Sequence, residues 1–258
     1  MENIENQDKD TKQEVIAGRN AVIEALKAEN NIDTIFISST ETQGSINKIK
    51  ALARAAGLVV KSSTTQKLDL MCDGVAHQGV VATISCAEYQ TVEDILAVSA
   101  KKGTAPFIII ADEIEDPHNL GAIIRTAEAC GADGVIIPKR RSASLSTTVY
   151  KTSAGAASVV PVAKVSNLVA CMKDLKKKNI WIYGAQMEGT SWCELDFADG
   201  GVALVVGSEG NGLTRLIKEE CDFFATLPMC GQINSLNASV AAGILMYEVT
   251  RQRINKNK

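Results

Sequence analysis

Three separated stretches of the chain combine the residue types from which a catalytic site can be built. The first is DPHNLGAIIR at residues 116–125, where Asn119 lies in the first turn of an expected helix and Arg125 lies among apolar residues. An Asn at such a point is commonly a turn or N-cap residue. An Arg with apolar neighbours is more often half of an ion pair than a catalytic group, and we expect Arg125 to be partly buried. The two side chains are six residues apart, which is about 120° around a helix, so they need not share one face.

The second stretch is GSEGNGL at residues 207–213, directly after an apolar run. Its three glycines permit positive φ angles and a close approach of a ligand to the backbone. The order of residues is neither G-x-G-x-x-G nor a G-K-[ST] loop, which argues against a dinucleotide-binding dehydrogenase and a nucleoside triphosphatase. A tight turn between a strand and a helix explains the glycines equally well. The anionic Glu209 between them is less expected of a plain turn.

The third stretch is LPMCGQINSLNAS at residues 227–239. Ser235 resembles a helix N-cap, and we expect Asn237 in the first helical turn, so capping explains Ser235 better than Asn237. Together the three stretches supply a cation, an anion and hydrogen-bonding groups. The only two histidines, His77 and His118, lack the spacing of metal ligands, and we therefore expect no metal site.

The elements that position these stretches alternate between strand and helix. This alternation predicts a mostly parallel sheet with helices on both faces, in which ligands bind beyond the carboxyl ends of the strands. All three stretches lie at such ends. The expected strands cover residues 106–114, 134–138, 158–165, 180–187, 201–207 and 223–229, and the expected helices cover 119–132, 144–154, 166–179, 213–221 and 235–253.

Four segments follow from the pattern along the whole chain. We expect a disordered acidic tail at residues 1–14, a small α/β domain at 15–88, a linker containing a short helix at 89–104, and the catalytic α/β domain at 105–258. In the small domain, the expected helices cover residues 18–30, 45–57 and 65–71, and the expected strands cover 32–38, 58–63 and 80–89.

The composition predicts a soluble protein of the cytoplasm. The chain has 46% hydrophobic and 22% charged residues, and no apolar run approaches the roughly 20 residues of a membrane helix. Its polar N-terminus resembles neither a signal peptide nor a transit peptide. The seven cysteines form no C-x-x-C pair, as expected of a reduced protein. Basic clusters at residues 139–141, 176–178 and 251–258 fit either solvated surface or a weak phosphate-contacting surface.

In order and spacing, the three stretches resemble the three signature motifs of the SpoU (TrmH-like) RNA ribose 2′-O-methyltransferases. The matching segments are DPHNLGAIIRTAEACGADGVIIP, LVVGSEGNGL and LPMCGQINSLNASVAAGILMYE, and KTSAGAASVVPV is also similar to the family. GRNAVIEAL and HQGVVA resemble the small RNA substrate-binding domain that often precedes the catalytic one. The resemblance covers about residues 15–253 and is closest to the ribosomal-RNA guanosine methyltransferase branch. Ala238 departs from the pattern, since many relatives carry a β-branched residue there.

The resemblance implies a knotted catalytic domain of the SPOUT type that acts on RNA as a homodimer. It implies S-adenosylmethionine as methyl donor, held in the knot mainly by backbone groups around Gly207, Leu227 and Leu236. It also implies a metal-free catalytic site formed by Asn119, Arg125, Glu209, Ser235 and Asn237.

The implied reaction transfers a methyl group to a ribose 2′-hydroxyl, with the oxygen, the methyl carbon and the sulfur in line. The expected target is a guanosine of 23S ribosomal RNA. We expect Arg125 to contact the 2′-oxygen with the help of an RNA phosphate, and Glu209 to organise the other polar groups. A free guanidinium is a very weak base, so either burial makes Arg125 a proton acceptor or Arg125 stabilises a developing alkoxide. Transfer RNA and an antibiotic-resistance site on ribosomal RNA are alternative targets, and a non-catalytic RNA-binding protein is the alternative of another class.

Overall fold

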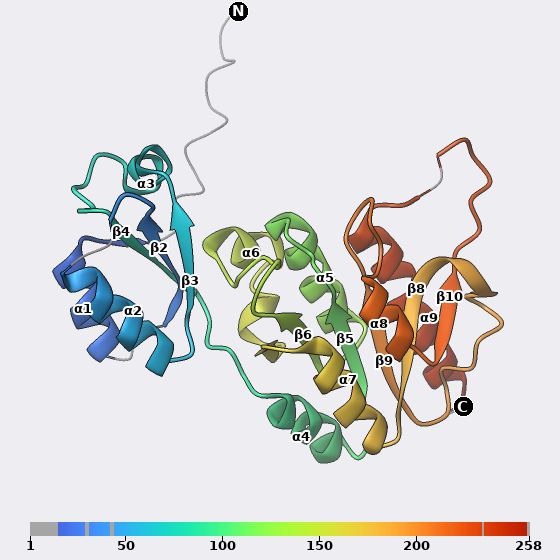
Figure 1. Ribbon diagram of the computed structural model, residues 1–258. Helices are drawn as coiled ribbons and strands as arrows, with labels where there is room; N and C mark the ends of the chain where they lie inside the picture. Colours follow the sequence, from blue (N-terminus) through green and yellow to red (C-terminus); the bar gives the residue numbers. More distant parts are fainter. Residues whose placement is uncertain (1–14, 29–30, 42–43, 234, 257–258) are drawn as a thin grey trace, which may run out of the picture. The chain divides into compact units, whose positions relative to one another are not determined.

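The computed structural model describes residues 15–28, 31–41, 44–233 and 235–256. The chain forms two compact units (Figure 1). The smaller unit contains the chain up to Glu88 together with Ser144–Thr148, and the larger unit is formed by Tyr89–Ala143 and Val149–Lys258. The predicted acidic tail, residues 1–14, lies outside the described residues. None of the helices in the described part of the chain is both long and apolar enough to span a membrane.

The smaller unit is a mixed four-stranded sheet with helices on both faces. Its strand order is β1-β4-β2-β3, and only β2 and β3 are parallel. Ile35 and Ile37 of β2 pack with α1 and α2, whereas Phe36 packs on the other face with α3. The bounds are β1 Val15–Ala17, α1 Arg19–Lys27, β2 Ile32–Ser38, α2 Ser45–Ala55, β3 Val59–Ser63, α3 Thr65–Cys72 and β4 Val80–Ile84. Of these, β1 was not predicted, because three residues are too few for a periodic pattern.

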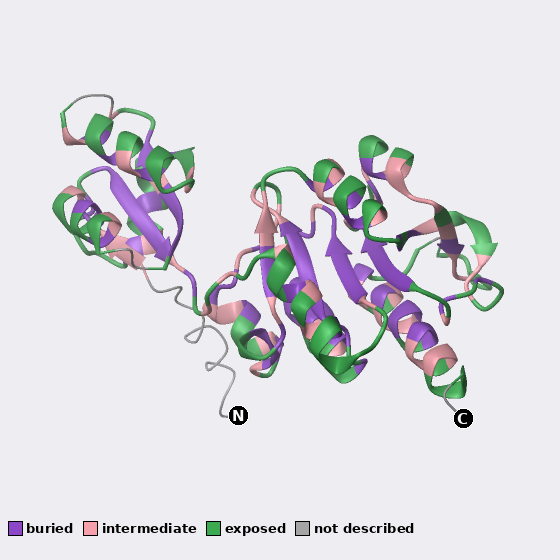
Figure 2. Cartoon of the chain, turned by 90° about the horizontal axis from the view of Figure 1, so that it is seen from below, coloured by how far each residue is buried: buried purple, intermediate pink, exposed green. Residues whose placement is uncertain are grey.

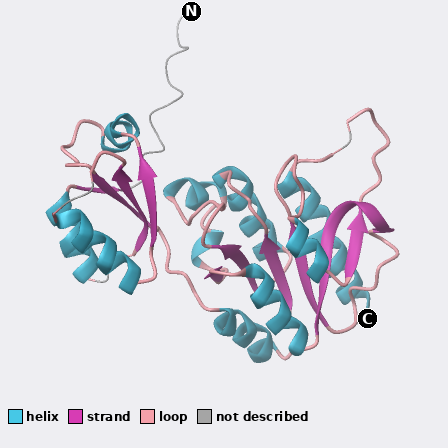
Figure 3. Ribbon diagram, in the orientation of Figure 1, coloured by secondary structure: helices cyan, strands magenta, loops and turns pink. Residues whose placement is uncertain are grey.

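The larger unit has a six-stranded, entirely parallel sheet with helices on both faces (Figure 3). Its order is β10-β8-β9-β5-β6-β7, which confirms the predicted fold class. Every residue of β5 and β9 is buried (Figure 2). The strands are β5 Phe107–Ala111, β6 Gly134–Pro138, β7 Val162–Val165, β8 Ile180–Ser191, β9 Gly201–Val206 and β10 Phe223–Thr226. The helices are α4 Val92–Lys102, α5 Pro117–Ala129, α7 Leu168–Lys177, α8 Arg215–Glu220 and α9 Ala238–Lys256, with a short 3₁₀ turn at Ala156–Ser158. The helix α6, Thr147–Thr152, has its first two residues in the segment assigned to the smaller unit and the rest in the larger unit.

The segment 89–104, predicted as a linker containing a short helix, belongs to the larger unit, and its helix is α4, Val92–Lys102. Thr91 and Asp94 form a capping box that starts the helix. Ile95 is fully buried in the core of the larger unit, and a Cβ atom at Gly134 would lie 2.5 Å from its Cγ1 atom. The absence of a side chain at Gly134 therefore lets α4 pack closely against β6.

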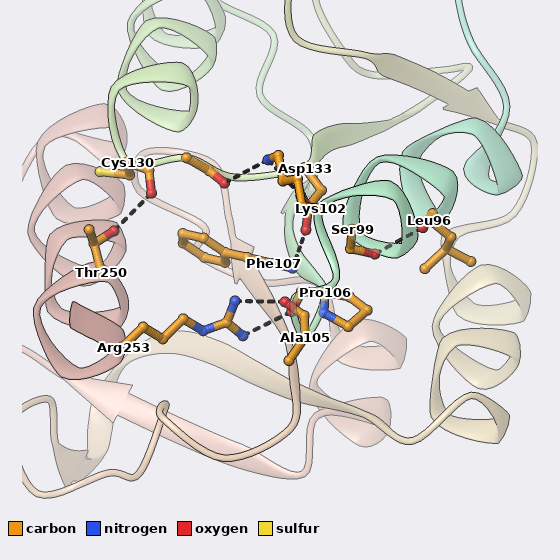
Figure 4. A network of polar contacts seen from close by, with 11 residues as sticks. Leu96, Ser99, Lys102, Ala105, Pro106, Phe107, Cys130, Asp133, Thr250 and Arg253 are labelled. Carbon is orange, nitrogen blue, oxygen red and sulfur yellow. Dashed lines mark hydrogen bonds and ion pairs between the residues drawn. The ribbon is translucent and has the colours of Figure 1, made fainter. Parts of the chain in front are cut away.

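Polar contacts tie α9 to the amino-terminal ends of the central strands. Arg253 donates hydrogen bonds to the carbonyl groups of Ala105 (2.8 Å) and Pro106 (3.0 Å), just before β5 (Figure 4). Asp133, just before β6, accepts from the backbone N–H of Phe107 (2.8 Å). These contacts hold one edge of the sheet together and leave the carboxyl-terminal edge to the three polar stretches.

Candidate active site

The first predicted residue, Asn119, lies in the first turn of α5. Asp116 caps this helix by accepting a hydrogen bond from the backbone N–H of His118 (3.0 Å), and Pro117 occupies the first helical position. Asn119 is 8% exposed. A buried amide side chain needs hydrogen-bond partners, and those of Asn119 come from the other two stretches.

The second stretch curls into a tight loop after β9. Ser208 and Gly212 exchange backbone hydrogen bonds of 3.2 and 2.9 Å, and Gly212 has a φ of 63°. A Cβ atom at Gly207 would lie 2.2 Å from the carbonyl carbon of Gly212, so a side chain there is incompatible with the turn. The glycines thus have a structural reason, and the loop they form presents Glu209 at the surface.

The third stretch ends at Asn237, which caps α9. The Asn237 side-chain oxygen accepts from the backbone N–H groups of Ser239 (2.9 Å) and Val240 (3.3 Å). We expected Ser235 to be this cap, and that prediction is wrong. The helix begins at the buried residue Ala238, three residues after the start of the expected helix at residue 235.

These three stretches meet at one carboxylate oxygen. Glu209 Oε1 accepts hydrogen bonds from Asn119 Nδ2 (3.0 Å), from Asn237 Nδ2, and from the backbone N–H of Ala238 (3.4 Å). Asn237 Nδ2 also donates to Asn119 Oδ1 (2.9 Å). We call Asn119, Glu209 and Asn237 the polar triad. Its geometry fixes two amide side chains around one negative charge, beyond the carboxyl ends of β5 and β9.

The other two predicted catalytic residues do not join the polar triad. Both Arg125 and Ser235 are exposed, and neither has a hydrogen bond or ion pair among the residues that the structure describes. The expected partial burial of Arg125 is therefore wrong. The apolar neighbours Ile123 and Ile124 face the core, whereas Arg125 lies on the outer face of α5.

The helix that carries Arg125 forms one wall of an apolar groove between α5 and α9. The groove has a volume of about 810 Å³. Its wall includes Ala122 and Thr126, three residues before and one residue after Arg125, together with Val240, Ile244 and Tyr247. Val240 and Tyr247 are 50% and 55% exposed. Large apolar side chains that share an exposed groove commonly mark an interaction site.

Asp112 supports the site and was not singled out in the sequence. It follows β5, is 3% exposed, and accepts a hydrogen bond from the backbone N–H of Thr214 (2.8 Å). Its own N–H donates to the carbonyl of Val206 (2.8 Å). Asp112 thereby fixes both ends of the loop that carries Glu209. Burial raises the pKa of Asp112, and the hydrogen bonds from Thr214 oppose that rise. A carboxylate at the end of an apolar strand is the signal that would have identified it.

The three residues predicted to hold the cofactor also lie at the carboxyl-terminal edge. Gly207 directly follows β9, Leu227 directly follows β10, and Leu236 lies just before α9. The described residues from Met229 to Leu236 are exposed, so their backbone N–H and carbonyl groups are accessible to a ligand. Among the described residues, the structure contains no group of three or more His, Cys, Asp or Glu side chains that could hold a metal ion.

Family models match both units of the chain. Residues 106–247 match the SpoU rRNA Methylase family, and residues 15–90 match the model described as RNA 2′-O ribose methyltransferase substrate binding. A TrmH family tRNA/rRNA methyltransferase of Bacillus subtilis, named YacO, is 45% identical over 242 residues, which is 92% of this chain and 95% of that protein.

Two solved structures with the same fold are SpoU or TrmH/SpoU enzymes. The SpoU methyltransferase AviRb from Streptomyces viridochromogenes, in complex with the cofactor AdoMet, superposes with a TM-score of 0.59 at 22% identity, covering 94% of this chain and 91% of that one. The TrmH/SpoU tRNA modifying enzyme of A. aeolicus superposes with a TM-score of 0.53 at 31% identity, covering 60% of this chain and 78% of that one. With the two family models and the B. subtilis relative, these matches confirm the resemblance found in the sequence: the chain belongs to the SpoU rRNA methylase family.

Proposed function

We propose that this chain transfers a methyl group from S-adenosylmethionine to a ribose 2′-hydroxyl of RNA, most specifically a guanosine of 23S ribosomal RNA in the cytoplasm. The observation that carries this proposal is the polar triad, in which Glu209 joins the three stretches that resemble the family's motifs. The substrate-binding model over residues 15–90 supports ribose 2′-oxygen as the acceptor.

The loops after β9 and β10 fit the proposed cofactor. AviRb has been crystallised with AdoMet, and the residues of this chain that would hold the same cofactor are Gly207, Leu227 and Leu236. Leu236 is exposed and Leu227 is half-buried, which leaves main-chain groups for hydrogen bonds to a nucleoside, whereas Gly207 is buried at the end of β9. Bound S-adenosylmethionine supplies an electrophilic methyl group, and the knot implied by the family resemblance would enclose it.

The exposure of Arg125 favours one of the two roles considered for it. Within one chain there is no burial to make the guanidinium a proton acceptor. A guanidinium aimed at the 2′-oxygen instead stabilises the negative charge that develops there, with an RNA phosphate as a further partner. The polar triad would orient substrate and cofactor beside it, and Ser235 would add a hydroxyl group from the exposed loop.

We propose that a second copy of this chain covers the groove between α5 and α9. The groove is apolar, and its wall includes Ala122 and Thr126 of the helix that carries Arg125. A homodimer would bury Val240 and Tyr247 and would bring a second subunit close to this helix. Sedimentation velocity of the wild-type chain and of Tyr247→Glu tests this arrangement. A wild-type dimer that becomes a monomer in the variant supports it, and a wild-type monomer contradicts it.

Transfer of tritiated methyl groups tests the reaction. Unmodified transcripts of 23S ribosomal RNA and of transfer RNA are incubated with the chain and labelled S-adenosylmethionine, and the modified nucleotide is then mapped by mass spectrometry. A 2′-O-methylguanosine in 23S RNA supports the full proposal, and label in transfer RNA overturns the proposed target. If the wild type and Glu209→Ala both bind RNA but label neither transcript, the chain is a non-catalytic RNA-binding protein.

A further inference from the structure

Hydroxyl groups line one end of the smaller unit's sheet. The parallel strands β2 and β3 end side by side, with Ser38 paired with Ser63, and α3 begins at Thr65. Ser38 Oγ lies 2.9 Å from Thr40 Oγ1 and 3.1 Å from Thr65 Oγ1. The carboxyl ends of parallel strands and the N-terminus of the following helix are places where proteins bind anions. The hydroxyl groups therefore surround a suitable position for a phosphate.

Ser63 has an unused hydroxyl group at this end. The residue is 9% exposed, and its Oγ atom has no hydrogen-bond partner among the described residues. Paired residues of neighbouring strands direct their side chains to the same face of a sheet. Because Ser63 pairs with Ser38, Ser63 Oγ lies on the face where Ser38 contacts Thr65. Buried hydroxyl groups are nearly always satisfied. An unsatisfied one beside other hydroxyl groups indicates a partner that comes from outside the chain.

Two lysines lie on the same face. Lys61 is two residues before Ser63 and therefore shares its face, and its Nζ atom lies 5.9 Å from the centre of the Phe36 ring. Lys67 lies in the first turn of α3, and its backbone N–H donates to Thr64 Oγ1 (3.3 Å). Both lysines are exposed, and neither forms an ion pair with a carboxylate in the described part of the chain.

The nearby carboxylates already have partners. Asp69 Oδ1 lies 2.9 Å from Nε2 of His77, and Glu41 accepts from Nη2 of Arg19 (2.6 Å). Among the described residues at this end of the smaller unit, Lys61 and Lys67 therefore have positive charges that remain available to a ligand. The basic clusters noted in the sequence differ from them, because carboxylates of the same chain hold several of their members, namely Arg141, Lys176, Lys177, Arg251 and Lys256.

We propose that this end of the smaller unit binds a phosphate group of the RNA substrate. Lys61 and Lys67 supply the charge, and Ser38, Ser63 and Thr65 supply hydroxyl donors. We call these five residues the hydroxyl-lysine site. The inference rests on the proposed function, because it takes the substrate to be RNA, and it assigns the substrate-binding task of residues 15–90 to particular side chains.

Steady-state methyl transfer by the full chain tests the hydroxyl-lysine site through the double variant Lys61→Glu and Lys67→Glu. The RNA probe is whichever unmodified transcript, 23S ribosomal RNA or transfer RNA, the wild type methylates. We expect KM for RNA to rise by about tenfold or more. We also expect the plot of the logarithm of the RNA-binding constant against the logarithm of the salt concentration to become less steep, with a slope smaller in magnitude by about one to two. We expect kcat at saturating RNA and the affinity for S-adenosylmethionine to stay unchanged.

The matched control is the double variant Lys48→Glu and Lys50→Glu. These lysines lie on α2, which packs against the opposite face of the same sheet, and their substitution changes the net charge equally. Equal KM and equal salt slope in the two double variants would overturn the proposed site while leaving the methyltransferase activity established. A wild type that methylates neither transcript would instead contradict the proposed function.

Ser63→Ala separates binding from folding. Removal of an unsatisfied buried hydroxyl group leaves the fold as stable as before or more stable. If that hydroxyl donates to a phosphate, the affinity for RNA falls by about two- to tenfold. Retention of wild-type RNA affinity by Ser63→Ala would remove Ser63 from the site.

Discussion

Asn119 and Asn237 lie 118 positions apart in the chain, and their side chains share a hydrogen bond of 2.9 Å from Asn237 Nδ2 to Asn119 Oδ1. The same Asn237 amide donates to Glu209, while its oxygen caps α9. One side chain thus joins the start of a helix to the polar triad. This double use means that the two ends of the Asn237 amide can be tested separately.

Asn237→Asp keeps the cap and removes the link to the polar triad. A carboxylate accepts the N–H groups of Ser239 and Val240 as the amide oxygen does, and its charge is favourable at a helix N-terminus. It cannot donate to Glu209, and it places a second negative charge beside that carboxylate. We expect methyl transfer to fall by about 100-fold with a smaller loss of thermal stability than in Asn237→Ala, where loss of the cap costs about 1 kcal/mol. Equal activity in Asn237→Asp and the wild type would contradict a role for the triad.

Arg125→Ala and Arg125→Lys test the exposed guanidinium. Because Arg125 is exposed and makes no polar contact with the described residues, we expect either substitution to change the free energy of unfolding by less than about 0.5 kcal/mol. Loss of a group that stabilises developing charge reduces the rate of methyl transfer by about 100-fold or more. Arg125→Lys keeps the charge without the planar fork and should retain an intermediate rate. Single-turnover transfer measures the rate, and wild-type transfer by Arg125→Ala would exclude Arg125 from the mechanism.

The alternation of elements was predictable because apolar runs and glycine-containing turns repeat along the chain. The order of the strands in the sheet was not predictable, because the sequence of an apolar strand does not indicate which other strand pairs with it. The exposure of Arg125 was predictable in principle. Residues 118, 122, 125 and 129 recur at helical spacing on the outer side of α5, whereas Ile123, Ile124 and Ala127 face the core. The apolar residues next to Arg125 in sequence concealed that periodicity.

Ser235 and Asn237 show where local sequence cannot decide. Both are residue types that cap helices, and they lie two positions apart. The choice depends on where the helix starts, which is set by the burial of Ala238 and by the bond from Asn237 to Glu209. Both of these are tertiary contacts. The convergence of the polar triad could therefore be expected from the family motifs, while its hydrogen bonds required the structure.

Arg253→Met tests the edge of the sheet opposite to the active site. The guanidinium donates to the carbonyl groups of Ala105, Pro106 and Gly200, and loss of charge-assisted hydrogen bonds costs about 2 kcal/mol. We expect a lower midpoint of urea unfolding and an unchanged rate of methyl transfer per folded molecule. Arg215→Met is the control, because its side chain is 79% exposed and its ion pair contributes at most about 1 kcal/mol. Equal midpoints for both variants would contradict the prediction.

Asp112 gives the folded protein a distinctive dependence on pH. Burial raises its pKa above the ordinary value of 3.8, so the folded state binds more protons than the unfolded chain between 3.8 and the raised value. The free energy of unfolding that Asp112 contributes is therefore full below 3.8 and declines as pH rises through that window. Asp112→Asn should lack this decline, which urea unfolding at a series of pH values measures.

Asp174→Asn provides a control of the opposite sign for Asp112→Asn. The hydrogen bond from Lys177 lowers the pKa of Asp174, so its contribution to stability is present above 3.8 and is lost as pH falls through the lowered value. Relative to the wild type, Asp112→Asn should become more stable as pH rises, whereas Asp174→Asn should become less stable. Parallel curves of the free energy of unfolding against pH for the wild type and Asp112→Asn, from pH 3 to 7, would contradict a raised pKa of Asp112 in the folded protein. The hydrogen bond from Thr214 that positions the Glu209 loop would then be independent of the charge of Asp112.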